Sequence, residues 1–274
     1  MAVSMADITK LRKLTGAGMM DCKNALNESN NDIEGAIEII RKKGQAVAAK
    51  REDREASEGC VLSEHNGDFA AVLALKCETD FVAKNEGFVK LTQDILNAAL
   101  AAKAKSIDEV ANLTINGQKI SELIIEEIGK TGEKMELGFY EYVEAPSTTS
   151  YNHLGNKLAT IVGFNIAGLD NHVGRDVAMQ VASMNPVAVT RDEVPAHLTE
   201  QELEIGKDKA RQEGKPEAML ERIAQGRLNK FFKENVLMEQ EFVKDGSMTI
   251  EAYLKSVNPE LKAISFKRVN LNED

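Results

Sequence analysis

The sequence predicts an α+β fold, and three observations support this prediction. Three short segments with apolar residues at helical spacing occupy roughly the first fifty residues. From Cys60 onward, strand-like and helical stretches follow one another, and two long polar helices then occupy residues 187–235. At 274 residues the chain is long enough for about two domains, each with a core of its own.

The N-terminal segment predicts three helices joined by short turns, which together make a small bundle. Ser4 and Asp7 fit the capping pattern of the first helix, and Asp32 is a good N-cap for the third, which we expect to end at Gly44. The apolar face of the second helix consists of Met19, Cys22 and Leu26. The charged stretch AAKREDREASEG follows, and we interpret it as a linker.

The central part predicts a β-hairpin, two helices and two further strands. The hairpin turns at Asn66-Gly67, and its second strand alternates apolar residues onto one face. The two further strand-like stretches cover residues 135–145 and 157–167. The first helix has Phe88, Leu91, Ile95 and Ala99 on its inner face, and the second has Ile120, Leu123, Ile124 and Ile128.

A weak internal repeat predicts two related α+β halves. The strand LALKC, its loop and the helix after it resemble IVGFNI, its loop and the helix after that strand. Cys77 to Phe88 and Ile166 to Val177 both span eleven residues. The segment FKRVN near the C-terminal end predicts a last strand that returns to the sheet.

Residues 187–235 predict a pair of antiparallel helices. The first helix begins near Thr199, and the break GKP at Gly214–Pro216 separates it from the second. The apolar stripe of the second helix consists of Leu220, Ala224, Leu228 and Phe231. Such a thin stripe favours a pair that projects from the body over a pair packed flat on it.

Composition and charge exclude several classes of protein. The net charge of −10 provides no basic footprint for nucleic acid, so we expect no direct contact with nucleic acid. No apolar run approaches the roughly 18 residues that span a bilayer, so we expect no membrane association. The opening MAVSMADITK lacks the order of a secretory signal, and a cytoplasmic location is the simplest expectation.

The cysteines and histidines predict neither a disulfide framework nor a metal site. The three cysteines are odd in number and widely spaced, and we expect buried reduced thiols at Cys22 and Cys77. The histidines show no HExxH motif or other tight ligand spacing. They are His65, His153, His172 and His197.

Two glycine motifs imitate nucleotide-binding loops. GAGMMD opens like a dinucleotide fingerprint, but a helical segment precedes it where a strand is required, so Gly16 and Gly18 favour a helix–helix turn. Gly129-Lys130-Thr131 resembles the end of a Walker A loop, but Ile124 occupies the position of its first glycine. The residue chemistry alone therefore indicates an acidic α+β protein that acts as a binding module.

Two stretches resemble the bacterial elongation factor Ts family. They are LRKLTGAGMMDCKNAL (Leu11–Leu26) and CETDFVAKNEGF (Cys77–Phe88), and three further matches cover nearly the whole chain in the expected order. These further matches are DIEGAIEIIRKKG, YNHLGNKLATIVGF and GKPEAMLERIAQGRLNKFF. The resemblance implies a guanine-nucleotide exchange factor that acts on elongation factor Tu, without a cofactor or covalent chemistry of its own.

The resemblance also implies a domain organisation. Residues 1–56 would form a UBA-like docking domain with its linker, and residues 57–145 the first of two related core subdomains. Residues 146–186 and 236–274 would form the second subdomain, with a coiled-coil hairpin inserted at 187–235. It leaves open whether this hairpin pairs two copies into a homodimer. Some relatives continue with a C-terminal helix that touches the partner, and we expect that contact to be missing here.

The tetrapeptide Thr79-Asp80-Phe81-Val82 is the exchange site that the resemblance implies. This loop would enter the GTPase domain of the partner and disturb its Mg²⁺ and phosphate site, with Phe81 as a wedge between helices and Asp80 near the metal region. From the residues alone, Asp80 would be a helix N-cap and Phe81 a hydrophobic staple. The resemblance favours the exchange site.

The remaining site residues would bind the partner. The resemblance implies docking by Met19, Met20 and Lys23, with Arg51 as a weaker candidate in the linker and His153 at a second contact. From the residues alone, the methionines would fill the bundle core and His153 would be a surface loop residue. The competing hypotheses are a different adaptor module and a nucleotide-binding enzyme that uses one of the two glycine motifs.

Overall fold

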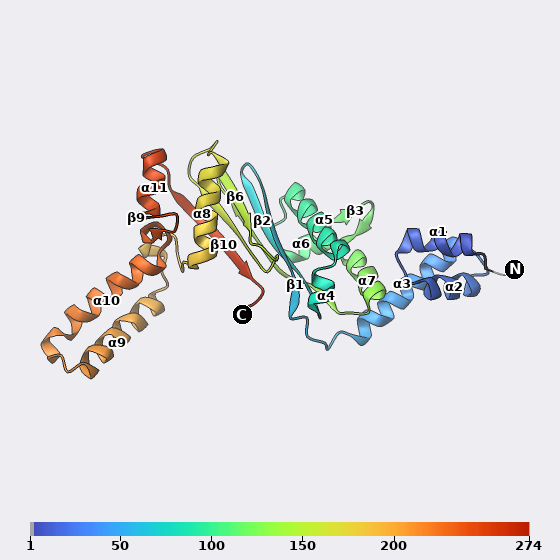
Figure 1. Cartoon of the computed structure of the whole chain (residues 1–274), viewed down its shortest axis with the longest axis horizontal. Coiled ribbons are helices and arrows are strands. Elements are labelled where there is room, and N and C mark those ends of the chain that lie inside the picture. The colour runs from blue at the N-terminus through green and yellow to red at the C-terminus, as the bar shows by residue number, and fades with distance from the viewer. Residues whose placement is uncertain (1–2, 274) are drawn as a thin grey trace. The chain divides into compact units, whose positions relative to one another are not determined.

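The computed structural model describes residues 3–273 and divides the chain into two compact units (Figure 1). The first comprises the residues up to 62, residues 73–141 and the C-terminal residues from 270. The second comprises residues 63–72 and 142–269. Helices and small antiparallel sheets are mixed in the chain, as the predicted α+β class requires. Within residues 3–273, no helix is long and apolar enough to cross a bilayer.

The first unit begins with three helices, in the three segments that the sequence predicts. They are α1 (Met5–Thr15), α2 (Met19–Glu28) and α3 (Ile33–Lys50). The Ser4 hydroxyl caps α1 and the Asp32 carboxylate caps α3, both by accepting a backbone N–H, as predicted. The buried residues between the helices are Ile8, Leu11, Ala17, Cys22, Ala25, Leu26 and Ala36.

The third helix does not end at Gly44, and this prediction was wrong. The helix continues to Lys50, so part of the predicted linker is helical, and Gly44 is buried in its middle. At Gly44, α3 packs against α7 (Ile120–Thr131), and a Cβ on Gly129 would lie only 2.8 Å from the Gly44 Cα. The glycine therefore permits a close approach of two helices rather than ending one of them.

The predicted hairpin consists of β1 (Glu58–Asn66) and β2 (Phe69–Cys77). The connecting residues are Gly67 and Asp68 rather than Asn66-Gly67, and Gly67 supplies the positive φ of 62°. Strand β2 is buried on both faces except at Lys76. The strand β5 (Met135–Glu144) completes a sheet with the order β1-β2-β5.

The remaining elements of the first unit lie between β2 and β5. Helix α5 buries Phe88, Ile95 and Ala99 as predicted, but Leu91 is only half-buried, whereas Thr92 and Leu96 are fully covered. The inner face is therefore rotated slightly from the predicted one. The elements in order are α4 (Asp80–Ala83), α5 (Glu86–Ala102), α6 (Ile107–Asn112), β3 (Thr114–Ile115), β4 (Gln118–Lys119) and α7.

The second unit is built around a sheet with the order β10-β7-β6, on which helix α8 packs. Strands β6 and β7 pair antiparallel, and β10 confirms the predicted last strand. The sequence analysis missed β6. The elements are β6 (Ser147–Asn152), β7 (Leu158–Phe164), α8 (Asn171–Met184) and β10 (Ala263–Asn270).

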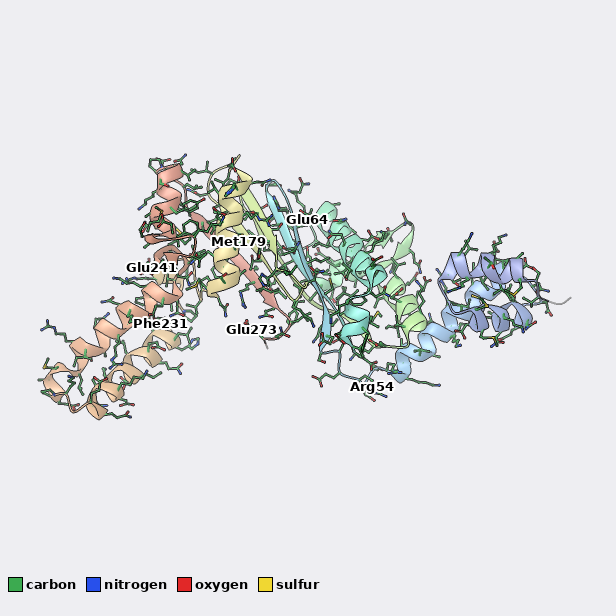
Figure 2. All side chains as sticks on the ribbon, viewed as in Figure 1. Arg54, Glu64, Met179, Phe231, Glu241 and Glu273 are labelled. Atoms are coloured by element: carbon green, nitrogen blue, oxygen red, sulfur yellow. The ribbon has the colours of Figure 1, made fainter. Side chains whose placement is uncertain are left out.

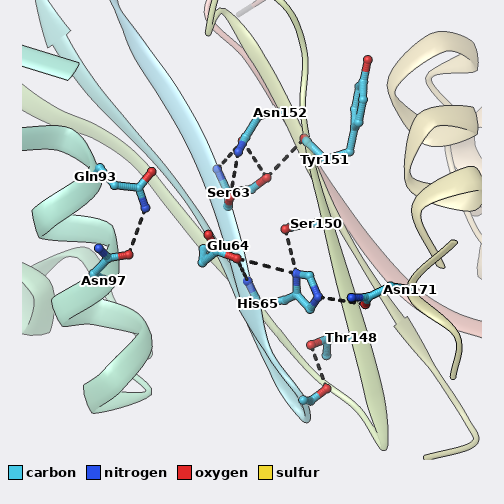
Figure 3. Close-up of polar contacts among 11 residues, drawn as sticks. Ser63, Glu64, His65, Gln93, Asn97, Thr148, Ser150, Tyr151, Asn152 and Asn171 are labelled. Carbon is cyan, nitrogen blue, oxygen red and sulfur yellow. Dashed lines mark hydrogen bonds and ion pairs between the residues drawn. The ribbon is translucent and has the colours of Figure 1, made fainter. Parts of the chain in front are cut away.

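Side-chain hydrogen bonds join β6 to the part of β1 that belongs to the same unit (Figure 3). The Asn152 side chain accepts from the Ser63 N–H at 2.6 Å and donates to the Ser63 carbonyl at 3.0 Å. Nearby, His65 Nδ1 lies 2.9 Å from Ser150 Oγ. The Asn152 amide thus provides the pairing that a neighbouring strand would otherwise provide.

Two helices, α9 (Ala196–Gln212) and α10 (Leu220–Asn235), occupy the segment predicted as a helical pair (Figure 1). Lys207 of α9 forms an ion pair with Glu221, and Arg211, one turn further along α9, forms one with Glu217. Because the residue numbers rise on one helix and fall on the other, the two helices run antiparallel. A Cβ on Gly206 would lie 3.0 Å from the Ala224 Cα, so the helices approach closely there.

Two details of this helical pair differ from the prediction. Helix α9 begins at Ala196 rather than near Thr199, and its N-cap is Pro195, whose ψ of 133° is that of extended backbone. The stripe of α10 continues from Leu228 to the buried Phe232, four residues on, whereas Phe231, which is labelled in Figure 2, is only half-buried. The apolar stripe therefore follows the i, i+4 spacing to its end.

The segment between α10 and β10 carries elements that the sequence analysis missed. Asp176 of α8 is almost completely buried and accepts from Lys244 Nζ at 2.5 Å and from the Tyr253 hydroxyl at 3.1 Å. These bonds attach the segment to α8. Its elements are β8 (Glu241–Phe242), β9 (Asp245–Thr249) and α11 (Ile250–Val257).

Candidate functional site

The predicted exchange site lies directly after β2, where the chain makes a single helical turn. The hydroxyl of Thr79 caps α4 and accepts from the Val82 N–H at 3.4 Å. Asp80 is the first residue of the helix, so the alternative in which Asp80 is the N-cap was wrong. Threonine is the residue with extended backbone before the turn, and only its hydroxyl reaches the free amide.

Phe81 is the most exposed aromatic side chain reported for residues 3–273, with 84% of its surface accessible. It therefore does not form the hydrophobic staple that the residue pattern alone suggested. Its neighbours in the turn are better covered: Ala83 is buried and Val82 is half-buried. A single exposed apolar side chain is common on protein surfaces, but this one is large, almost fully accessible and therefore available for contact with another protein.

Asp80 has an ion-pair partner within the same turn. Lys84 Nζ donates to Asp80 Oδ2 at 2.6 Å, one helical turn away. This hydrogen bond is the main reason that the pKa of the Asp80 carboxyl is lowered from its ordinary value. Both side chains are solvent-exposed, so the carboxylate remains ionised and accessible next to Phe81.

A network from a distant segment anchors the residues before this turn, and sequence reasoning missed it. Glu133 accepts from the Thr79 N–H at 3.0 Å and from the Thr79 hydroxyl at 2.6 Å. Next along the chain, the Lys134 N–H donates to Glu78 Oε1 at 2.7 Å. No signal of spacing could have revealed this network, because its partners lie more than fifty residues apart in the sequence.

Arg51 is brought to the same network by the end of α3. Its Nη1 lies 3.1 Å from both carboxylate oxygens of Glu78, the residue before Thr79. The Lys134 ammonium in turn donates to the backbone carbonyls of Glu52 and Arg54, the latter labelled in Figure 2. Arg51 therefore supports, through Glu78, the turn of residues 78–83, which we call the exchange turn because the sequence predicts the exchange site there.

The Cys77 thiol lies beneath the turn and stays protonated. It is fully buried and donates to the Thr79 carbonyl at 3.3 Å. Burial, followed by the negative charge of Glu133, raises the pKa of Cys77 from its ordinary value of 9.0 to about 12. Cys22 and Cys77 are buried, as predicted, and Cys60 is buried as well; within residues 3–273 none of the three forms a disulfide.

We expect the free energy of unfolding to fall as the pH rises from about 9 to about 12. In the unfolded chain the Cys77 thiol ionises near its ordinary value, whereas in the folded chain its raised pKa keeps it neutral. The stability from this group is thus fully present below pH 9 and is lost above it. Urea midpoints of the wild type and Cys77→Ala across this range measure the effect.

The Cys77→Ala variant should show a shallower decline than the wild type. Some decline should remain, because burial and the Asp176 carboxylate also raise the pKa of Tyr253, from 10.0 to about 12. Equal slopes for the wild type and Cys77→Ala would show that Cys77 does not contribute.

The second candidate surface lies on α2. Met19 and Met20 are 49% and 63% exposed, and Lys23 is also exposed. The predicted apolar face is confirmed at Cys22 and Leu26, which fill the core with Ala25, and it was wrong at Met19. The alternative of bundle-core methionines was also wrong. The two methionines present flexible apolar side chains beside a cation, which suits contact with another protein.

His153 lies in the second unit, in the turn between β6 and β7. Its Nδ1 is 3.0 Å from the Tyr151 hydroxyl, and its backbone N–H donates to the Leu158 carbonyl at 2.9 Å. The neighbouring Leu154 is 93% exposed, which the sequence analysis did not single out. His153 and the exposed Leu154 therefore lie together at the tip of this hairpin, where they could contact another protein.

The predicted site residues thus occupy three surfaces. Arg51 joins Thr79–Val82, whereas Met19, Met20 and Lys23 share α2, and His153 belongs to the other unit. Within residues 3–273, no three histidine, cysteine, aspartate or glutamate side chains gather as they would around a metal ion. The chemistry that these surfaces offer is that of protein recognition.

A family model described as Elongation factor TS matches residues 78–273, which begin at Glu78 of the exchange turn. The chain is also similar to Elongation factor Ts of Porphyromonas gingivalis strain ATCC 33277, at 58% identity over the full length of both chains. This chain belongs to the elongation factor Ts family. The resemblance read from the sequence is confirmed.

Other members of the elongation factor Ts family align with nearly all of the chain. The protein of Azobacteroides pseudotrichonymphae is 53% identical over 99% of each chain, and that of Bacteroides thetaiotaomicron is 45% identical over the whole of both. The N-terminal helices before Glu78 lie outside the family-model match but inside these alignments. Membership of the elongation factor Ts family supports a role in translation elongation.

Proposed function

We propose that this chain is a guanine-nucleotide exchange factor for elongation factor Tu. It binds the GDP-bound and nucleotide-free forms of that GTPase and promotes release of GDP, after which GTP binds. The observation that carries this proposal is Phe81, 84% exposed on a turn that Glu133 and Arg51 anchor from outside. Membership of the elongation factor Ts family supports the choice of partner.

The proposed mechanism acts on the Mg²⁺ and phosphate site of the partner. Phe81 enters between helices of the partner's GTPase domain, and the ionised Asp80 acts near the metal region. Mg²⁺ requires nearly ideal octahedral geometry and takes much of its coordination from water and phosphate. A small shift of the surrounding loops therefore displaces the ion, and the uncompensated phosphate charge weakens the binding of GDP.

Linkage makes this mechanism reversible. If the factor weakens nucleotide binding, nucleotide binding must weaken the hold of the factor by the same ratio. Either nucleotide then releases the factor, so the factor itself does not need to select GTP. No cofactor and no covalent step of this chain takes part.

One aromatic side chain cannot supply the whole effect. A thousandfold acceleration requires about 4 kcal/mol, whereas burial of one aromatic side chain contributes about 1.5–3 kcal/mol. We therefore assign the remainder to docking by Met19, Met20 and Lys23 on a UBA-like bundle and by His153 on the second of two related core subdomains. The helices α9 and α10 would form a coiled-coil hairpin, which this mechanism does not use.

The two glycine motifs support an exchange factor over a nucleotide-binding enzyme. Gly16, with a φ of 68°, ends α1, and Gly18 precedes α2, so GAGMMD joins two helices and no strand leads into it. Gly129 lies in the last turns of α7, where the helix dipole repels phosphate, and its Cα faces Gly44. Gly129-Lys130-Thr131 therefore provides no helix N-terminus for a phosphate, and the helix N-terminus within GAGMMD carries the acidic Asp21 in its first turn, which disfavours an anion there.

Stopped-flow release of fluorescent GDP from the cognate elongation factor Tu tests the proposal. In millimolar Mg²⁺ the chain should accelerate release by orders of magnitude, and it should not bind labelled GDP by itself. If the ion holds GDP in place, release with the Mg²⁺ chelated should already be fast, and the acceleration by the chain should shrink to a few-fold at most. If the chain does not accelerate release in Mg²⁺, the exchange-factor proposal is wrong and the chain is only a binding module. If the acceleration is equally large without Mg²⁺, the chain does not act through displacement of the ion.

A further inference from the structure

We propose that Glu133 is the positioning residue of the exchange turn, an inference that rests on the proposed function. Its carboxylate accepts from both donors of Thr79, the backbone N–H at 3.0 Å and the hydroxyl at 2.6 Å. By holding Thr79 in this way, Glu133 sets the direction in which Phe81 points. The role is not catalytic, because Glu133 acts through Thr79 and Phe81.

The turn needs such a support because α4 is too short to hold itself. It spans four residues, and isolated helices of this length are unstable in water. Within the turn, the ion pair between Asp80 and Lys84 is exposed on both sides, and exposed pairs of this kind contribute little. The orientation of Phe81 must therefore come from contacts outside the turn.

Two successive residues after α7 provide these contacts as a clamp. The Glu133 side chain accepts from Thr79, and the Lys134 N–H donates to Glu78 at 2.7 Å. Each segment donates to a side chain of the other, so residues 78–79 and 133–134 are held in a fixed position relative to each other. Arg51 forms an ion pair with the same Glu78 carboxylate, and the Glu78 side chain is only 14% exposed.

The geometry makes the carboxylate of Glu133 hard to replace. Both of its oxygens accept, one from a backbone N–H and one from a hydroxyl. A glutamine has one acceptor oxygen and one donor NH₂, so it can keep the first bond only by turning a donor toward the hydroxyl. Glu133→Gln therefore keeps the size of the side chain, while the Thr79 hydroxyl loses its acceptor and the anchor loses its negative charge.

The first measurement is a titration of elongation factor Tu·GDP with wild type and Glu133→Gln. We expect the maximal rate of GDP release at saturating factor to fall about tenfold, because the turn then spends less time in the competent orientation. The half-saturating concentration should change by less than about threefold, since the docking surfaces on α2 and at His153 are untouched. The matched control is Glu127→Gln, which removes a carboxylate of α7 whose side chain contacts Lys130.

A double-mutant cycle separates positioning from a general structural effect. If Glu133 acts through Phe81, then Phe81→Ala with Glu133→Gln should be no slower than Phe81→Ala alone. If the two effects multiply instead, Glu133 acts by another route and the proposal is wrong. A wild-type maximal rate for Glu133→Gln would overturn it as well.

A fluorescence measurement tests the positioning without the partner. The chain contains no tryptophan, so Phe81→Trp creates a single reporter at the tip of the turn. Adding Glu133→Gln should lower the fluorescence anisotropy of this tryptophan, while Glu127→Gln should leave it unchanged. An unchanged anisotropy with Glu133→Gln overturns the inference even if exchange is observed, whereas a lower anisotropy without exchange supports the inference and refutes only the proposed function.

A second variant covers the case in which Glu133→Gln does not fold, as judged by circular dichroism. Thr79→Ser keeps both donors. Thr79→Val keeps the shape but removes the hydroxyl, and with it both the bond to Glu133 and the cap on the Val82 N–H. Thr79→Val should reproduce the loss of maximal rate and of anisotropy, and Thr79→Ser should retain both. Equal behaviour of these two variants would contradict the role of the hydroxyl–carboxylate bond.

Discussion

Phe81→Ala is expected to lower the maximal rate of GDP release from elongation factor Tu by about 10- to 100-fold. The substitution removes the burial of one aromatic side chain in the complex, which contributes about 1.5–3 kcal/mol, and about 1.4 kcal/mol corresponds to a factor of ten in rate. The fold should be unaffected, because this side chain is 84% exposed in the free chain. Stopped-flow release with fluorescent GDP, at saturating factor, measures the loss.

The control for this variant is Phe139→Ala, which truncates another exposed phenylalanine, on β5. Its maximal rate should stay within about twofold of the wild type, whereas Phe81→Ala should still bind nucleotide-free elongation factor Tu. If Phe81→Ala exchanges as fast as the wild type, membership of the elongation factor Ts family stands but the assignment of the wedge does not. If both variants lose activity equally, the effect is not specific to the exchange turn.

Gly129→Ala and Gly226→Ala should change stability in opposite directions. A Cβ on Gly129 would lie 2.8 Å from the Gly44 Cα, so α3 and α7 must move apart, at a cost of about 1–3 kcal/mol. Gly226 lies in the middle of α10, and a Cβ there meets nothing within 4 Å. In that position alanine should stabilise the helix by about 0.5–1 kcal/mol, because it loses less conformational entropy.

Urea unfolding followed by circular dichroism measures both changes. The two glycines lie in different units, so the transition of each unit should be followed with a local probe as well. A lower midpoint for Gly129→Ala and a higher one for Gly226→Ala would support close helix packing as the reason for the first glycine. If both variants become more stable, α3 and α7 do not pack at this distance in solution.

The contrast between these two glycines shows what sequence reasoning could reach. Gly226 and Gly129 both stand in helical patterns, and neither has a local feature that separates an open position from a crowded one. Gly44 was read as a helix end for the same reason, although it is buried in the middle of α3. A glycine that permits close packing is recognised only when the partner helix is known.

The candidate site divides in the same way. The motif CETDFVAKNEGF indicated the exchange turn and the family, because its residues are contiguous. From the residues alone the exposure of Met19 and Met20 was not predicted, because Met19 shares the helical spacing of the buried Cys22 and Leu26. Only the resemblance implied that both methionines contact a partner. Glu133 was missed because its hydrogen bonds to Thr79 cross fifty-four residues of sequence.

The sequence by itself determined the caps at Ser4 and Asp32, the type of the strands and helices that it predicted, and the family, because each depends on residues close together in the chain. Only the tertiary structure decided which way the turn at Phe81 is held and which glycines lie between helices. Those outcomes depend on contacts between residues far apart in the sequence: the Glu133 carboxylate meets the Thr79 hydroxyl, and Gly129 meets Gly44, only when the whole unit folds. Local patterns carry no record of such partners.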